Sequence, residues 1–194
     1  MHTVAGLPNA VLLPTFETEK RRDISMMKSA IVTGVLLAGA TLGPACVQAA
    51  PAREKPSIIR IKSNPGAIIS SVASVPAGSA IHYLSGSVAS PLDPAKPEDL
   101  GDTRQQTLSI LTKMRAQLEA LGLGMGDVVK MNVFLVGVPE NGGRMDAPAM
   151  NEVFKTFFGT AEQPNTPTRS TVQVAALGRP YVLVEIEAIA AKAP

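Results

Sequence analysis

The chain has 194 residues, of which 18 are Lys or Arg and 16 are Asp or Glu, so its formal net charge is only +2. This near-neutral charge, together with the absence of Trp and a 4% aromatic content, argues against a nucleic-acid-binding surface. The single cysteine, Cys46, excludes an intrachain disulfide and a site built from several thiolates.

Residues 1–50 are expected to form a leader that precedes the folded domain. Ser29–Ala45 is apolar, uncharged and rich in Gly and Ala; Lys28 precedes this segment and small residues follow it. A basic start, an apolar middle and a small-residue exit are typical of a secretory signal peptide, here over about residues 26–50. The alternative, a buried N-terminal helix, is disfavoured by Pro44 and by the absence of a polar face.

The leader predicts a periplasmic or secreted protein, and a cytoplasmic one if residues 1–50 do not act as a leader. Without it, residues 51–194 carry 14 basic and 13 acidic residues, a net charge of +1, and no cysteine. About 145 residues suffice for one hydrophobic core but not for two, so we expect one domain. Its only histidine, His82, is expected to be structural, because the domain has no cysteine or second histidine to complete a metal site. We expect no nucleic-acid partner, and no membrane contact after the leader is removed.

The first part of the domain is predicted to contain three short strands. β-Branched residues cluster at 57–62 and 68–75, with an Asn-Pro-Gly turn between them. The third strand, AIHYLS at 80–85, ends at Gly86. Three prolines then make 88–101 a loop.

A helix is predicted to follow, with Asp102 as its cap, Gln105 completing a capping box and Gly122 as its stop. Its expected apolar stripe is Leu108, Leu111, Met114, Leu118 and Leu121. After a strand at 128–136, a second helix is predicted to begin at Met145, with Asp146 as its cap. Its expected buried face is Met150, Val153, Phe154 and Phe157.

The last stretch, Pro167–Ala190, is predicted to form two strands, at 170–176 and 181–189. The short connection between them contains Gly and Pro, which favours an antiparallel hairpin. Alternation places Glu185 and Glu187 on one face of the second strand. Arg169 lies at the entry to the first of these strands and is a cation near them, and for an arbitrary hairpin a surface ion pair would be its simplest role.

The predicted order is therefore βββαβαββ, an α/β (α+β) domain with two helices against one sheet. Helices that cover only one face leave the other face of the sheet in need of cover. A monomer with a polar outer face is one solution, although apolar residues on both sides of the last strand argue against it.

Several motifs of this chain resemble those of the RidA/YjgF family of reactive intermediate deaminases. PTRSTVQVAAL at 167–177 and VEIEAIA at 184–190 are similar to the family's closing signature. LSG at 84–86, DVVKMNVFL at 127–135 and MNEVFKTFF at 150–158 match further parts of its pattern in the same order. The resemblance covers about residues 58–191.

The resemblance implies a chorismate-mutase-like α/β fold that assembles into a homotrimer, with clefts between subunits. It also implies hydrolysis of enamines and imines of short 2-oxo acids to the oxo acid and ammonia, without a metal or organic cofactor. The expected partners are a small carboxylate-bearing imine or 2-oxo acid and further copies of this chain.

The family's functional residues match specific positions of this sequence. Arg169 matches the carboxylate-binding arginine, whose guanidinium can hold a carboxylate through two parallel N–H bonds. Glu185 matches the residue that positions and activates water. Ser85, Gly86 and Asn151 match cleft-lining residues, and Thr171 stands where the family often has a cysteine. Glu187 has no matched role, and we interpret it as structural.

The chain also departs from the family pattern. A Tyr that packs over the ligand is absent from the segment 68–72, and Ser87 replaces a frequent Gln. Residues 138–143 resemble a small insertion. Two hypotheses follow: an exported imine/enamine deaminase, or an exported trimer that binds a small carboxylate without turnover.

Overall fold

The computed structural model describes residues 54–194, and the leader expected over 1–50 lies outside the described residues. In chain order the elements are β1 (Ile59–Ile61), β2 (Val72–Ser74), β3 (Ala80–Val88), α1 (Thr103–Ala120), η1 (Met125–Asp127), β4 (Val128–Val138), η2 (Pro139–Asn141), β5 (Arg144–Met145), α2 (Ala147–Phe157), β6 (Thr168–Val174) and β7 (Val184–Lys192). This is the predicted order, with the two-residue strand β5 and two short 3-10 helices added.

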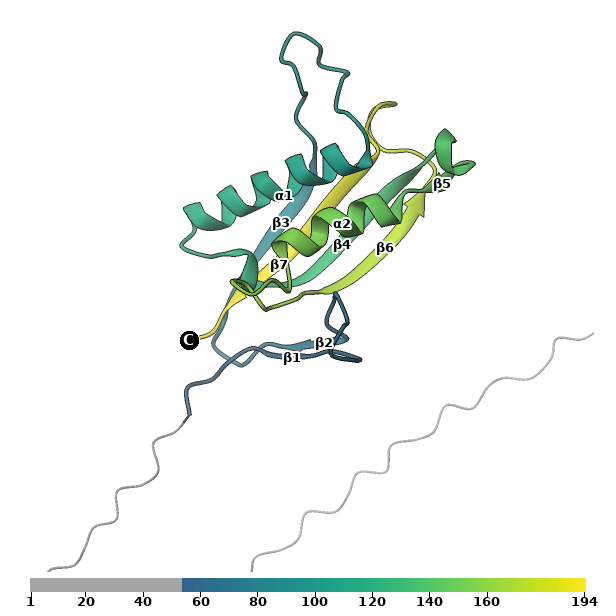
Figure 1. The fold of residues 1–194 in the computed structure, drawn as a ribbon. Coiled ribbons are helices and arrows are strands. Elements are labelled where there is room, and N and C mark those ends of the chain that lie inside the picture. The colour runs from purple at the N-terminus through teal and green to yellow at the C-terminus, as the bar shows by residue number, and fades with distance from the viewer. Residues whose placement is uncertain (1–53) are drawn as a thin grey trace, which may run out of the picture. The chain divides into compact units, whose positions relative to one another are not determined.

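Strands β3, β7, β4 and β6 lie side by side in that order, and α1 and α2 cover one face of the sheet (Figure 1). β7 is antiparallel to both β3 and β4, whereas β6 runs parallel to β4. The predicted α+β architecture, with two helices on one face of a mixed sheet, is confirmed.

The antiparallel hairpin predicted between the last two strands is wrong. β6 ends at Val174 and β7 begins only at Val184, so the connection is longer than the sequence suggested. Within it, Val182 is buried, and the carbonyl of Leu183 accepts a hydrogen bond from the backbone N–H of Val136 (2.9 Å). The connection crosses from one side of β4 to the other, so β6 and β7 pair with opposite edges of that strand. The buried Val182 and the hydrogen bond of Leu183 hold the connection along this path.

Alternation along the strands gives the sheet a core face and an open face. On the core face, every second residue of β4 is fully buried beneath the helices: Met131, Val133 and Leu135. Glu185 and Glu187 of β7 lie on the open face, in register with Phe134 and Asn132 of β4. The prediction that the two glutamates share one strand face is confirmed, and the helices leave this face uncovered (Figure 1).

Both predicted helix caps are present, but the apolar stripe of α1 differs from the prediction. Asp102 and Gln105 form the capping box of α1, and Asp146 accepts a hydrogen bond at the start of α2. Leu108 and Leu121 are 50% and 56% exposed. Compared with the predicted stripe, the buried face of α1 excludes Leu108 and Leu121 and includes three polar residues of its first turns. The buried residues are Thr103, Gln106, Thr107, Ile110, Leu111, Met114 and Leu118.

Gln106 is fully buried and joins α1 to the connection before β7. Its Nε2 donates to the backbone oxygens of Gly101 (2.9 Å) and Tyr181 (3.0 Å), and its Oε1 accepts from the N–H of Leu183 (2.9 Å). A buried amide with these partners is satisfied. Its burial is therefore compatible with the helix packing against the sheet.

The second helix has the predicted buried face, Met150, Val153, Phe154 and Phe157. It begins at Ala147 rather than at Met145, because Met145 belongs to β5 and pairs with Gly137 of β4. Among residues 54–194, no helix is both long and apolar enough to span a membrane.

β1 and β2 form a separate two-stranded sheet. The prediction of a single sheet is therefore wrong for these two strands, which do not extend the main sheet. Polar contacts attach this small sheet to the rest of the domain. The buried Ser70 donates through Oγ to the carbonyl of Thr166 (2.7 Å), and Nη2 of Arg60 donates to the carbonyl of Gly126 (2.7 Å). Its own apolar side chains are largely exposed, which is why it cannot be held by core packing.

Candidate functional site

Arg169, the residue expected to bind a carboxylate, lies in β6 beside α2. Its Nη2 donates to Oδ1 of Asn151 (2.7 Å), and its guanidinium carbon lies 4.3 Å from the centre of the Phe154 ring. Nη1 lies 3.6 Å from Sδ of Met150. These contacts hold the guanidinium in one orientation. Burial lowers the pKa of Arg169 below its ordinary value, but arginine remains charged in proteins.

Thr171 lies two residues further along β6, and therefore on the same strand face as Arg169. Its Oγ1 is buried and has no hydrogen-bond partner among the described residues. We call Arg169, Asn151 and Thr171 the arginine group. An unpaired buried hydroxyl on the same strand face as a fixed guanidinium is a group that a bound ligand or an ordered water can satisfy.

Glu185 lies in β7 on the open face, and its carboxylate lies over Gly86 of the neighbouring strand β3. A Cβ atom at position 86 would overlap with Oε1 of Glu185. The register of β3 against β7 shifts between Leu84 and Ser87, so Ser85 and Gly86 form a β-bulge. We call Ser85, Gly86 and Glu185 the carboxylate group. The bulge therefore brings the backbone of Ser85 and Gly86 next to the carboxylate of Glu185 on the open face of the sheet.

The arginine group and the carboxylate group lie on opposite faces of the sheet. Arg169 is in register with Met131, which is buried on the core face, whereas Glu185 is in register with Phe134 on the open face. The structure therefore brings the predicted residues together in two groups but does not join the groups within one chain. The simplest role considered for Arg169, a surface ion pair with a glutamate, is wrong, because no ion pair among residues 54–194 includes Arg169.

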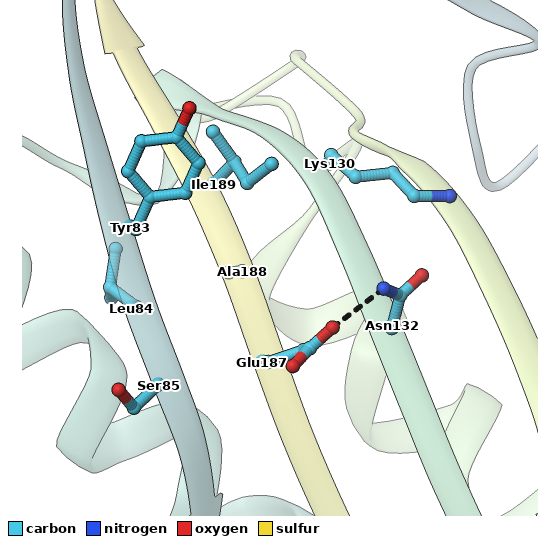
Figure 2. Close-up of a pocket in the computed structure, with 8 residues that line it drawn as sticks. All are labelled: Tyr83, Leu84, Ser85, Lys130, Asn132, Glu187, Ala188 and Ile189. Atoms are coloured by element: carbon cyan, nitrogen blue, oxygen red, sulfur yellow. Dashed lines mark hydrogen bonds between the residues drawn. The ribbon is translucent and has the colours of Figure 1, made fainter.

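Beside the carboxylate group, the open face contains a pocket of about 280 Å³ (Figure 2). Its lining residues are Tyr83, Leu84, Ser85, Lys130, Asn132, Glu187, Ala188 and Ile189. Nδ2 of Asn132 donates to Oε1 of Glu187 (2.7 Å). The sequence analysis did not identify Lys130 and Asn132. The alternation of the strand at 128–136 was the available signal, because it places both on the face opposite the buried Met131.

Within the part of the chain that the structure describes, no group of three or more His, Cys, Asp or Glu side chains is arranged to hold a metal ion. The arginine group and the carboxylate group consist of a guanidinium, a carboxylate, an amide, two hydroxyls and the backbone of Gly86.

The chain is similar to known proteins over most of this domain. The family model described as Endoribonuclease L-PSP matches residues 62–192. TdcF of Escherichia coli K12, provisionally named a reactive intermediate deaminase, is 38% identical over 135 residues, which are 70% of this chain and 96% of TdcF. A protein of Dermatophagoides farinae named 2-iminobutanoate/2-iminopropanoate deaminase is 42% identical over 89 residues, 46% of this chain and 61% of that protein.

A solved structure has the same fold. The Rid-family protein YyfB of Yersinia pestis superposes with a TM-score of 0.53 at 25% identity, over 69% of this chain and 96% of that one. The match of the family model to two thirds of the chain, together with these relatives, shows that the chain belongs to the RidA/YjgF family.

Proposed function

We propose that this protein hydrolyses short-chain 2-imino acids, and the enamines that tautomerise to them, to 2-oxo acids and ammonia. The observation that carries the proposal is that the chain has both an arginine held by a hydrogen bond to Asn151 and a carboxylate, that of Glu185, that fits above Gly86 because glycine has no side chain. The names of relatives support the same class of substrate. The near-neutral charge of the chain does not favour a polyanionic RNA substrate.

In this proposal Arg169 binds the carboxylate of the 2-imino acid through two N–H groups. Asn151 and Phe154 keep the guanidinium in place, so substrate binding costs little reorganisation. The unpaired hydroxyl of Thr171 is available as a further hydrogen-bond partner of the substrate.

Glu185 acts on water. It accepts a proton as the water oxygen adds to the imine carbon, and it returns that proton to the nitrogen. The hydroxyl group then gives up its proton, which the amino nitrogen takes up, so the carbon–nitrogen bond breaks with ammonia as the leaving group and the hydroxyl oxygen becomes the carbonyl oxygen of the 2-oxo acid. The products are a 2-oxo acid and ammonia, so one water is consumed and no electrons are exchanged. Backbone and hydroxyl groups of Ser85 and Gly86 orient the imine.

The site is proposed to form between copies of the chain. Arg169 and Glu185 lie on opposite faces of one sheet, so a single chain does not offer both to one substrate. In a homotrimer with head-to-tail contacts, the arginine group of one copy can meet the carboxylate group of the next. Such an assembly also gives the open face of the sheet a cover.

The same geometry supports a second candidate, an exported trimer that binds small carboxylates without turnover. The segment where the family has a ligand-covering Tyr contains Ile68 and Ile69 instead. That change removes an aromatic wall and a hydroxyl from the proposed site, and it leaves the carboxylate anchor intact. The two candidates differ in the role of Glu185: in the enzyme it activates water for hydrolysis, and in the binding protein no hydrolysis takes place.

The deciding experiment is a coupled assay with freshly generated 2-iminopropanoate, run on the parent and on a mixed oligomer. Arg169→Ala and Glu185→Gln are each expected to be nearly inactive alone. If the site combines two copies, unfolding and refolding an equal mixture restores about one quarter of the parent rate, since half of the arginine groups and half of the carboxylate groups are intact. Glu187→Gln, on the same face of β7, serves as the matched control.

No parent activity, with tight binding of 2-oxobutanoate, would favour the binding protein over the enzyme. An active parent whose mixed oligomer shows no recovery, although mass spectrometry proves that the variants exchange subunits, would place the site within one chain. A stable, active monomer in light scattering would contradict the shared site directly.

A further inference from the structure

A second cavity, of about 220 Å³, lies on the helix side of the sheet, near the ends of α1 and α2. It is lined by Arg115 and Glu119 of α1, by Met125, and by four residues between 156 and 163. We call it the helix-end pocket. We propose that this pocket binds a free α-amino acid with an apolar side chain, whose carboxylate contacts Arg115 and whose ammonium group contacts Glu119. The proposal does not depend on the proposed hydrolysis, because the pocket shares no residue with the arginine group or the carboxylate group.

The proposed assembly leaves the helix-end pocket open. α1 and α2 cover one face of the sheet, whereas the assembly covers the other, the open face (Figure 1). The arginine group, which also meets a neighbouring copy, lies on a different side of α2. Asn151 and Thr156 are five residues apart in that helix, so their side chains point about 140° apart around its axis. The pocket is therefore turned toward α1 and away from the part of β6 that carries Arg169.

Arg115 and Glu119 bring opposite charges to one rim of the pocket without satisfying each other. They are one turn apart in α1, and Nε of Arg115 lies 4.0 Å from Oε1 of Glu119, which is beyond hydrogen-bond distance. Their side chains are 51% and 64% exposed, so the pair contributes little to stability and is separated at little cost. An α-amino acid carries its carboxylate and its ammonium group on the same carbon atom, so it needs two receptors that lie as close together as these.

The base of the pocket is apolar and supports the guanidinium. Phe157 and Met125 are only 8% and 6% exposed. The guanidinium carbon of Arg115 lies 5.4 Å from the centre of the Phe157 ring, within the range of a cation–π contact. That contact holds the Arg115 charge at the pocket, and the two buried side chains offer an apolar surface to the side chain of the ligand.

Hydrogen bonds fix the shape of the wall that follows α2. Nε2 of Gln163 donates to the carbonyl of Phe157 (3.0 Å), and its Oε1 accepts from the backbone N–H of Asn165 (2.8 Å). The backbone N–H of Gln163 donates to Oγ1 of Thr160 (3.0 Å). Because the Thr160 oxygen is the acceptor in that bond, its own proton is available to the carboxylate of the ligand. A wall that is formed in advance needs little reorganisation when a ligand binds.

A lone anion suits this pocket less well than a zwitterion. α1 ends at Ala120 and α2 ends at Phe157, so both helices present their C-terminal ends near the pocket. The C-terminal end of a helix carries a partial negative charge and favours cations. A ligand whose ammonium group accompanies its carboxylate is therefore favoured over a simple carboxylate. The volume of about 220 Å³ suits a small molecule.

The test compares L-leucine with 4-methylpentanoate, which lacks the ammonium group, and with 3-methylbutan-1-amine, which lacks the carboxylate. The assembled full-chain protein, its size checked by light scattering, is titrated with each probe, and the methyl NMR signals of its methionines are followed. L-leucine is expected to shift the Met125 signal with a dissociation constant on the order of 1 mM, as suits so small a ligand. Met131, which is fully buried, should not shift. The other two probes are expected to bind about tenfold more weakly, or weaker still, because each lacks one charged contact.

Variants identify the two charges responsible. Arg115→Gln and Glu119→Gln are each expected to weaken L-leucine binding by about tenfold or more, and both positions are exposed, so the fold should be unaffected. Arg104→Gln is the matched control. Arg104 also pairs with a glutamate, Glu152, on the helix side, but neither residue lines the pocket, so binding should stay within about twofold of the parent. Equal binding of the three probes, unchanged binding in Arg115→Gln or in Glu119→Gln, or no Met125 shift in the assembled parent would each overturn the proposal.

Discussion

The carboxylate of Glu185 occupies the space above Gly86 that a side chain at position 86 would fill. Gly86 does not have a positive φ angle, so its backbone conformation does not require glycine. The space above Gly86 is instead occupied by Glu185, whose outer atoms are the ones that a Cβ would meet. Because those atoms end a flexible side chain, a methyl group can move the carboxylate at little cost to the fold.

Gly86→Ala is therefore expected to reduce turnover of 2-iminopropanoate by about 10- to 100-fold, since a displaced catalytic group loses its alignment. The melting temperature should stay close to that of the parent. Gly124→Ala is the matched control, because a Cβ there meets no atom within 4 Å. Parent-like activity in Gly86→Ala would show that the position of the Glu185 carboxylate is not critical.

Local patterns in the sequence predict much of this fold. The period-two alternation of VEIEAIA places both glutamates on one face, and the capping residues Asp102 and Asp146 mark the helix starts. These features depend on residues that are close in sequence. They identify the elements and the faces that the elements bury.

Long-range arrangement was harder to predict. The connection between β6 and β7 contains turn residues, which suggested a hairpin, but its apolar residues near Val182 pack into the core and direct β7 to the far side of β4. The crossing puts β4 between Arg169 and Glu185, and the register of β6 and β7 on β4 puts the two side chains on opposite faces of the sheet. No local pattern shows it, because it depends on which neighbour each strand pairs with.

Gln106 offers a stability test of the same long-range packing. Gln106→Leu keeps the volume but leaves the N–H of Leu183 and the carbonyl of Tyr181 without their partner. The free energy of unfolding should fall by about 2–4 kcal/mol in denaturant titration, as expected for buried polar groups left unpaired. Gln117→Leu, an exposed position of α1, is the control and should change little. A similar small effect at Gln106 would mean that water replaces these bonds.

The N-terminal segment leads to a prediction about processing. We propose that residues 1–50 direct export and are removed, since the apolar segment has the charge and size pattern of a signal peptide. Intact-mass analysis of protein isolated from its native host should then give an N-terminus near Ala50 or Pro51. Recovery of soluble cytoplasmic protein that retains residues 1–49 would contradict export.

Arg169→Lys is expected to impair ligand binding nearly as much as Arg169→Ala. Charge alone predicts a mild effect, because lysine keeps the positive charge. The guanidinium, however, is planar; it donates to Asn151 and lies over the Phe154 ring, which leaves its other N–H groups aimed in a fixed direction. A flexible ammonium cannot reproduce that orientation. The loss should be about 2–4 kcal/mol, or roughly 30- to 1,000-fold in affinity for 2-oxobutanoate, measured by calorimetry.

Arg179→Lys provides the matched control for this substitution. Arg179 also lies over an aromatic ring, that of Tyr181 at 5.3 Å, but it belongs to neither the arginine group nor the carboxylate group. Its replacement should leave affinity within twofold of the parent. If Arg169→Lys also bound 2-oxobutanoate as tightly as the parent, with fold and assembly intact, Arg169 would not be the carboxylate anchor. The assignment of the arginine group would then fail, because Asn151 is assigned to it only through its hydrogen bond with the guanidinium.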